Sequence, residues 1–183
     1  MATVKSIIET AAAMLDMKEI TFSGSQVVSN YDPTVVALVE CLNNVIEEIA
    51  TEYIHFEATE EITLSNGKFD YASLQKQVFQ IIKIEEDGAP CEFMCYPTFA
   101  EVETKCPKIK VRYYYIPDKV TITGSVNYPK LNARLLSLGV ASDYALIVGR
   151  YEESINYDKQ YMYALQSAQR TRKSIAVKAR RWI

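Results

Sequence analysis

Three cysteines near the middle of the chain are the residues whose type could support metal chemistry. Three residues separate Cys91 from Cys95, and ten separate Cys95 from Cys106. A zinc knuckle usually places two residues between its paired cysteines, so this spacing is not the usual one. Cys91 and Cys95 have the same parity in a strand and would point to one face of a sheet, where buried free thiols explain them equally well. We therefore expect no bound metal, and a zinc enzyme remains an alternative.

The other residues that could act in catalysis are one histidine and a set of carboxylates. His55 lies in the strand-like stretch "EYIHFEA" without a serine or cysteine beside it to act as a nucleophile, so we interpret it as structural. The carboxylates lie near predicted turns, where solvated charge explains them better than acid–base catalysis; they are Glu60, Glu61, Glu85, Glu86 and Asp87. The glycines are scattered and form no phosphate-binding loop. The sequence therefore predicts neither an enzyme nor a cofactor.

Helical periodicity places these residues between two pairs of helices. The clearest start signal is Asp32 followed by Pro33, because an aspartate caps a helix and a proline suits its first position. Gly149 separates the last two helices, which are expected to form an antiparallel αα-hairpin. Apolar residues are so dense before Gly149 that the third helix is expected to be buried on most sides, and Ile155 is expected on the buried face of the fourth. The four predicted helices are residues 3–16, which Thr3 can cap, 33–53, 129–148 and 150–171.

The segment between the helix pairs, residues 54–126, has β texture. Short runs rich in branched and aromatic residues alternate with turn signals, among them the Asn-Gly pair in "SNGK". The expected strands include "VFQIIKI", "CEFMCY", "KIKVRYYYI" and "VTIT", whereas "PTFAEVETKCP" is interpreted as a connection. We expect about four to six strands, antiparallel because the connections are too short for helical crossovers.

These elements predict an α+β fold with a small helical bundle, an inserted antiparallel β domain and an extended C-terminal tail. The predicted helical core comprises residues 1–53 and 129–172, from both ends of the chain. The inserted β domain comprises residues 54–128, and the docking tail comprises residues 173–183. A length of 183 residues, with 49% hydrophobic and 23% charged residues, suits one globular domain with such an insertion.

Charge is unevenly distributed along the chain. Six cations and no acid lie in the last fourteen residues, "RTRKSIAVKARRWI", although the whole chain has a net charge of −3. Residues 1–169 therefore carry a formal charge of −9, and such an acidic body does not favour binding to a phosphate backbone. No apolar run is long enough for a membrane span and no secretion signal is recognised, so we expect a protein that has no membrane association and folds in a reducing compartment.

The basic segment also has the pattern of a strand. Ile175, Val177 and Ala179 alternate with Ala176, Lys178 and Arg180, which is a period of two. Such a strand can pair with its own sheet, add to the sheet of a partner or lie in a groove. We expect it to insert into a partner subunit, because arginine and tryptophan often supply much of the energy of an interface. The predicted partner-binding residues are Lys173, Ile175, Val177, Lys178, Arg180, Arg181, Trp182 and Ile183.

About the last 55 residues resemble the C-terminal half of the head-to-tail adaptor proteins of tailed phages, also called connector, head-completion or neck proteins. These proteins have a helix that ends in an apolar run, a "GRYEE"-like turn, a tyrosine-rich second helix and a basic segment that ends in "RRW". The corresponding residues here are "LLSLGVASDYALIVGRYEESINYDKQYMYALQSAQRTRKSIAVKARRWI". For residues 1–53 the likeness is one of architecture, and the β region could be particular to a subgroup.

The resemblance implies a structural virion protein rather than an enzyme. It implies a homo-oligomeric ring, generally a dodecamer, which is assembled in the host cytoplasm and lies under the portal in the neck of the virion. Residues 173–183 would dock on the portal protein, other surfaces would hold the next tail or neck protein, and DNA would pass through the lumen without sequence-specific binding. The alternatives are a tail-terminator or other neck ring protein, and a DNA-associated packaging protein that uses the basic segment.

Overall fold

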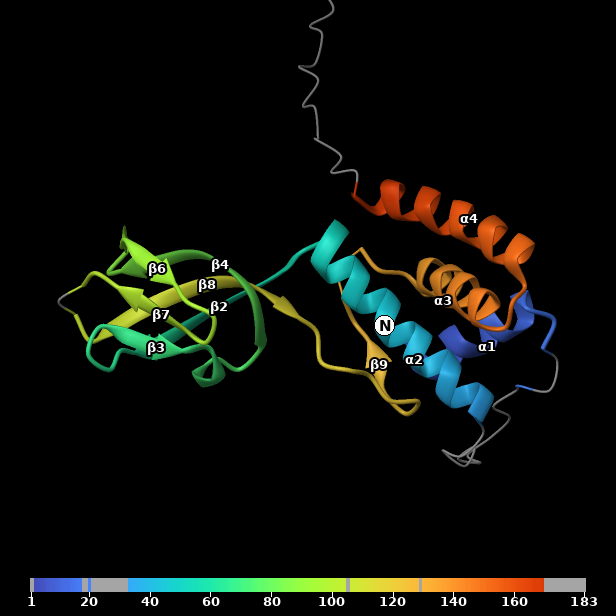
Figure 1. Ribbon diagram of the computed structural model, residues 1–183, viewed down its shortest axis with the longest axis horizontal. Helices are drawn as coiled ribbons and strands as arrows, with labels where there is room; N and C mark the ends of the chain where they lie inside the picture. Colours follow the sequence, from blue (N-terminus) through green and yellow to red (C-terminus); the bar gives the residue numbers. More distant parts are fainter. Residues whose placement is uncertain (1, 18–19, 21–32, 105, 129, 170–183) are drawn as a thin grey trace, which may run out of the picture.

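The computed structural model describes residues 2–17, 20, 33–104, 106–128 and 130–169. Figure 1 shows an elongated molecule in which the α-helices gather at one end and most of the strands at the other. The described residues contain four α-helices and antiparallel sheets, which confirms the predicted α+β class. No helix in the described part of the chain combines the length and the apolar character that crossing a membrane requires.

The first helix, α1, comprises Val4–Met14 and begins as predicted. The Thr3 hydroxyl accepts a hydrogen bond from the amide of Ser6 at 3.2 Å, which satisfies one of the free donors of the first turn. Immediately before α1, strand β1, Ala2–Thr3, pairs antiparallel with β9, Ser125–Val126. This small sheet was not predicted, and it ties the start of α1 to the segment that returns from the β end.

The second helix, α2, comprises Pro33–Glu48 and continues into one π-helical turn, η1, Ile49–Tyr53. Pro33 is its first residue, as predicted, whereas the predicted cap Asp32 lies outside the described residues. The buried apolar side chains of α2 recur at three- and four-residue steps, which aligns them along one face. They are Val35, Leu38, Cys41, Leu42, Val45 and Ile46.

Helices α3, Ala133–Ile147, and α4, Tyr151–Gln169, form the predicted αα-hairpin. Asn132 caps α3, because its side-chain oxygen accepts a hydrogen bond from the Leu135 amide at 2.8 Å. Gly149 makes the turn with a φ of +79°, a conformation that is inexpensive for a residue without a β-carbon.

The predicted burial of this hairpin is wrong at its turn. Helix α3 is buried from Leu135 to Ser142 and at Ala145, but Ile147 and Val148 are exposed. Ile155, expected on the buried face of α4, is also exposed, and Ser154 is buried instead. No described element covers the apolar side chains at the turn, so they stay exposed in spite of their density in the sequence.

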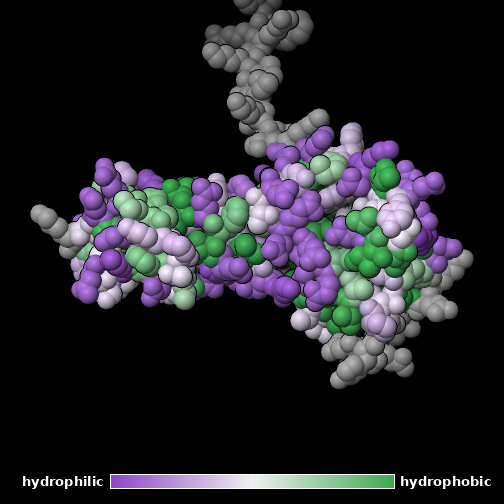
Figure 2. Space-filling model, viewed as in Figure 1, coloured by the Kyte–Doolittle hydropathy of each residue, from purple (hydrophilic) through white to green (hydrophobic). Residues whose placement is uncertain are grey.

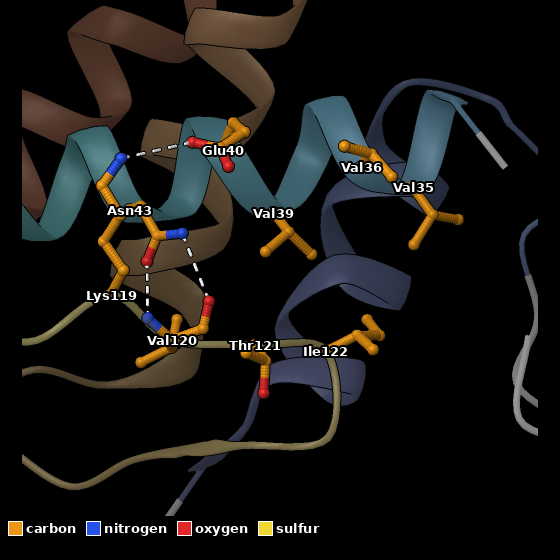
Figure 3. Close-up of a pocket in the computed structure, with 9 residues that line it drawn as sticks. All are labelled: Val35, Val36, Val39, Glu40, Asn43, Lys119, Val120, Thr121 and Ile122. Atoms are coloured by element: carbon orange, nitrogen blue, oxygen red, sulfur yellow. Dashed lines mark hydrogen bonds and ion pairs between the residues drawn. The ribbon is translucent and has the colours of Figure 1, made fainter. Parts of the chain in front are cut away.

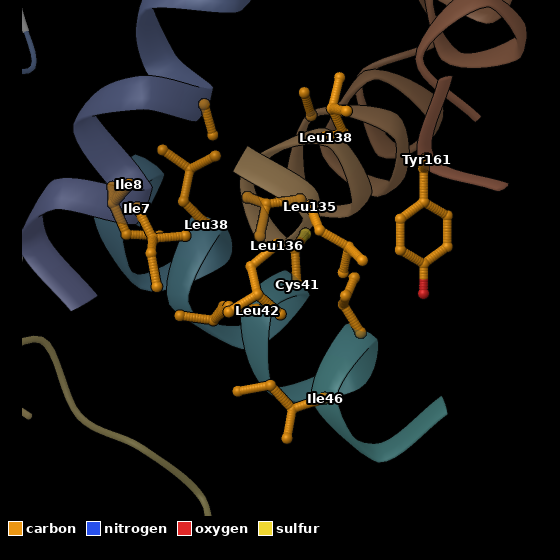
Figure 4. Packing of buried hydrophobic residues seen from close by; sticks show 14 of the residues in the cluster. Ile7, Ile8, Leu38, Cys41, Leu42, Ile46, Leu135, Leu136, Leu138 and Tyr161 are labelled. Carbon is orange, nitrogen blue, oxygen red and sulfur yellow. The ribbon is translucent and has the colours of Figure 1, made fainter. Parts of the chain in front are cut away.

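The four helices share one hydrophobic core (Figure 4). Ile7 of α1, Leu42 of α2 and Leu136 of α3 are fully buried in it, and Leu165 of α4 is almost so. Burying each of these side chains stabilises the fold by about 1.5–3 kcal/mol. Gly139 of α3 lies against Val45 of α2 and Tyr161 of α4, so helices from both ends of the sequence pack on one another.

The β end contains a four-stranded sheet, in the order β2–β8–β4–β5, and a three-stranded sheet, in the order β3–β7–β6. All neighbours in both sheets are antiparallel, as predicted. Asn66 and Gly67 join β2 to β3 with φ values of 53° and 74°, as the predicted tight turn requires. The bounds are β2 Phe56–Thr63, β3 Lys68–Asp70, the 3-10 turn η2 Tyr71–Ser73, β4 Gln77–Glu86, β5 Ala89–Pro90, β6 Phe93–Cys95, β7 Phe99–Val102 and β8 Lys108–Ile116.

Three predictions for this region are wrong. The stretch "PTFAEVETKCP", interpreted as a connection, contains β7, because Ala100 and Val102 alternate into the core. The stretch "VTIT", interpreted as a strand, pairs with no strand in the described residues, and the backbone of Val120 is held by the side chain of Asn43 instead. The described part of residues 54–126 contains eight strands rather than four to six. The excess comes from β5 and β9, which have two residues each.

The strands share a second hydrophobic cluster. Tyr113 of β8 is fully buried in it, and its hydroxyl donates a hydrogen bond to Glu60 of β2. Where the two ends of the molecule meet, the ring of Phe56 stacks on that of Tyr128 with centroids 4.6 Å apart. This aromatic contact joins the first residue of β2 to the segment that leads into α3.

Candidate interaction surfaces

The residues predicted to bind a partner lie outside the part of the chain that the structure describes. They are Lys173, Ile175, Val177, Lys178, Arg180, Arg181, Trp182 and Ile183. Helix α4 is described as far as Gln169, whose side-chain amide donates to the backbone oxygen of Tyr53 at 3.1 Å. The docking role of residues 173–183 therefore stays a prediction. The described residues offer other surfaces, at the turn of the helical hairpin, on α2 and along a sheet edge.

The structure does not bring the three central cysteines together. The Tyr71 hydroxyl interacts with Cys95, the Cys106 thiol faces Glu86, and Cys91 packs at the margin of the β core. The hydrogen bond to Glu86 raises the pKa of the Cys106 thiol, which disfavours the thiolate that a metal requires. In the ranges that the structure describes, no group of three His, Cys, Asp or Glu side chains is placed to hold a metal ion.

His55 is held at the junction between η1 and β2. Its Nδ1 donates a hydrogen bond to the backbone oxygen of Ala50 at 3.0 Å. Its ring packs against Tyr114, with centroids 4.6 Å apart, and lies 6.0 Å from the ring of Phe79. These contacts join the end of η1 to the four-stranded sheet, so the imidazole helps to hold this junction together.

The carboxylates singled out in the sequence have structural partners of their own. Glu60 accepts hydrogen bonds from the Tyr113 hydroxyl and from the Gln75 amide, the latter at 3.0 Å. Glu86 accepts one from the Thr104 hydroxyl. These bonds hold Glu60 and Glu86 in place. Glu61, Glu85 and Asp87 line a shallow hollow together with Gly88, Lys108 and Lys110.

The turn of the α3–α4 hairpin carries an exposed apolar cluster, which we call the hairpin-tip patch: Leu146, Ile147, Val148, Tyr151 and Ile155. Between 47% and 66% of each of these residues is accessible to solvent. Tyr151 and Ile155 are four residues apart and therefore share a face of α4. Figure 2 shows hydrophobic residues reaching the surface of the helical end of the molecule. Clusters of this kind mark sites of protein association when they lie on a well-packed surface.

The base of the hairpin-tip patch is anchored by polar contacts. The Arg150 guanidinium donates to the backbone oxygen of Leu15 at 2.9 Å and to Glu153 at 2.8 Å. The Tyr157 hydroxyl donates to the backbone oxygen of Met14. The turn is thus fixed to the end of α1. A partner would meet side chains that are already positioned, which lowers the entropy lost on binding.

A groove of about 300 Å³ lies between α2 and residues 119–122 (Figure 3). Val36 and Val39 form the helical wall, and Ile122 faces them from the other side. Asn43 fixes the far wall, since its amide nitrogen donates to the Val120 oxygen at 3.2 Å and its oxygen accepts from the Val120 amide at 2.8 Å. The groove is mainly apolar, and its polar groups are engaged in holding the wall together.

Two carboxylates are half-buried between α2, α3 and α4. Burial, and then the charge of Asp158, raise the pKa of Asp143 on α3. Burial, and then the charge of Asp143, raise the pKa of Glu48 on α2, although the Tyr161 hydroxyl donates to Glu48 at 3.5 Å. Among the described residues, neither carboxylate pairs with a lysine or arginine. Their ionisation therefore opposes folding, because the folded chain holds these protons to a higher pH than the unfolded chain does.

Strand β2 forms one edge of the four-stranded sheet. In the described residues β8 alone pairs with it, along all eight residues from Phe56 to Thr63. No other backbone hydrogen bond joins β2 to the described part of the chain. Glu57 and Glu61 are exposed on its outer face, whereas Ala58 and Ile62 pack against the β core. The free edge was not predicted from sequence, because strand order depends on contacts between distant segments.

No protein-family model matches the chain, and no curated protein sequence matches it.

Proposed function

We propose that the chain is a structural protein of the phage head–tail junction, where it forms a ring beneath the portal. In this proposal, residues 1–53 and 129–172 form the body of the ring, and the inserted β domain, residues 54–128, extends from it. Residues 173–183 dock on a portal subunit, and DNA passes through the central opening. The observation that carries the proposal is the hairpin-tip patch, because exposed apolar side chains on anchored helices are typical of a subunit interface.

The composition of the patch supports an assembly role. Its five members are large and uncharged, as the centre of an interface usually is. A tyrosine or isoleucine that becomes buried at such a centre can contribute about 2 kcal/mol of binding free energy. In a ring the contact is heterologous, so the patch of one copy would meet a different surface of the next copy.

The charge distribution supports the same proposal. Residues 1–169 carry a formal charge of −9, which suits the wall of a channel that DNA has to pass without binding. The six cations from Arg170 onward can then serve contacts with acidic protein surfaces. The resemblance of the C-terminal segment to adaptor proteins points to the portal as the protein that provides such a surface.

The proposal is tested by measuring the oligomeric state of the full chain over a wide range of concentration. We expect a closed ring that dissociates on dilution. Replacing the 66% exposed Ile147 with aspartate should raise the dissociation concentration at least about tenfold, since a charge would be forced into an apolar contact. Met94→Asp is the matched control, because Met94 is 61% exposed but lies in the β end.

Two outcomes would refute the proposal. One is a chain that stays monomeric at every concentration and also in the presence of a portal. The other is a ring that tolerates Ile147→Asp as well as it tolerates Met94→Asp. Binding of DNA that weakens steeply with added salt would favour the packaging protein instead. A deletion of Lys173–Ile183 that leaves portal binding intact would refute the docking role of that segment alone.

A further inference from the structure

We propose that the free edge of β2 is a binding site for an extended basic strand, and that this strand is the segment 173–183 of a second copy of the chain. The eight residues of β2 span about 27 Å. In an antiparallel pair, alternate residues direct both backbone groups away from the partner, so about four N–H and four C=O groups point outward along this edge. Such an edge recruits an additional strand unless something covers it, and no described strand pairs with it.

The side chains of β2 disfavour pairing with the β2 of another copy. Three of its eight residues, Glu57, Glu60 and Glu61, are acidic, and none is basic. A β2–β2 contact would bring these carboxylates close together across the new pair, and like charges at opposed positions destabilise a sheet. The edge therefore selects a strand of the opposite charge.

The sheet already alternates in charge from strand to strand. On the outer face β8 presents Lys108, Lys110 and Arg112, and β2 presents Glu57 and Glu61 beside them. The Arg112 guanidinium binds Glu57 at 2.6 Å, and Glu61 lies directly opposite Lys110. A cationic strand on the free side of β2 would continue this order. Its charges would lie about 5 Å from the carboxylates and about 10 Å from the cations of β8.

Within the segment 173–183, the residues from Ile175 to Arg180 have the matching pattern on both faces. Lys178 and Arg180 have one parity and would lie on the face of Glu57 and Glu61, whereas Ile175 and Val177 have the other parity. Since the two cations are two residues apart and the two glutamates are four apart, one cation would lie opposite a glutamate and the other diagonal to it. The second face would then extend the apolar cover over the inner side of β2, where Ala58 and Ile62 are half-buried. Eleven residues are enough to pair with all eight of β2.

Exchange of this strand would join copies head to tail, because each copy gives one strand and receives one. The inference concerns the free chain and does not rest on the virion function. In an assembled particle, the portal and the β2 edge would compete for the same segment.

The experiment measures binding of a fluorescent synthetic peptide of residues 173–183 to the full chain, by anisotropy. Glu61→Lys in the chain should weaken binding about tenfold, because an attractive cross-strand pair becomes a repulsive one. Glu85→Lys is the matched control. Glu85 lies on β4 at the other side of Lys110, at the same level as Glu61 but away from the free edge, so binding should change less than about twofold.

Two further measurements identify the mode of binding. A peptide with Lys178→Glu and Arg180→Glu should bind the Glu61→Lys chain better than the parent chain. Amide hydrogen exchange should slow at residues 56–63 when the parent peptide binds, and a Val177→Pro peptide should fail to slow it, since proline cannot donate to a ladder.

Three outcomes would overturn the proposal. They are no binding of the peptide, equal weakening by Glu61→Lys and Glu85→Lys, and protection from exchange at a site other than β2. A fourth measurement follows exchange at β2 without added peptide, over a range of protein concentrations. If β2 is protected equally at every concentration, the segment of the same chain occupies the edge, and the assignment to a second copy is overturned. None of these outcomes depends on the hairpin-tip patch, so failure here is distinct from failure of the ring.

Discussion

Replacing Gly139 with alanine is expected to destabilise the protein, although alanine is the better helix former. Gly139 is buried on α3 at its contact with α2 and α4. A β-carbon added there would lie 2.8 Å and 3.0 Å from the two γ-carbons of Val45, and 3.1 Å from Cε2 of Tyr161. Non-bonded carbons prefer about 3.5–4.0 Å, so the helices would have to move apart.

The magnitude follows from two opposing effects. Alanine gains about 1 kcal/mol over glycine in the interior of a helix. Forcing an extra carbon into a packed core costs about 1–3 kcal/mol, and the closest contact here involves a β-branched side chain with little freedom to turn away. We therefore expect a net loss of about 1 kcal/mol from the free energy of unfolding.

The assay is urea unfolding followed by the helical circular dichroism signal, for a double-mutant cycle with Val45→Ala. Val45→Ala alone should cost about 2 kcal/mol by leaving a cavity. In the double variant the new methyl group occupies part of that cavity, so the combined loss should be smaller than the sum by about 1 kcal/mol. If Gly139→Ala alone stabilises the protein, or the two changes are additive, the close packing of α2 on α3 is not what requires glycine.

Two further predictions concern polar groups of the helical end. Asp143→Asn should stabilise the protein at neutral pH, because the folded state raises the pKa of Asp143 and its ionisation opposes folding. The gain should vanish as the pH falls below about 4, because the aspartate is then protonated in both the folded and the unfolded state. The measurement is the free energy of unfolding of the variant and of the parent over a range of pH. Asn43→Ala should cost about 2 kcal/mol in urea unfolding, because it removes both hydrogen bonds to Val120. A variant as stable as the parent would show that water replaces both bonds.

The sequence by itself determined the features that depend on neighbours along the chain. The cap at Thr3, the helix start at Pro33, the turn at Gly149 and the Asn-Gly turn before β3 all occur where local rules place them. These rules describe hydrogen bonds and backbone angles within about four residues, so the printed sequence contains all the information that they need. The α+β class followed from the same periodicities.

Only the tertiary structure decided which apolar side chains are buried and which strands have a free edge. Leu146, Ile147 and Val148, at the end of an apolar run, have the composition of a core, but no described element covers their side chains. The stretch "VTIT" has the composition of a strand, but Asn43, 77 residues away from Val120, takes up its backbone groups. The acidic edge of β2 exists because β8, and no other described strand, pairs with it. Burial and strand pairing depend on which distant segments come into contact. The periodicity of side chains along the sequence does not show which segments these are.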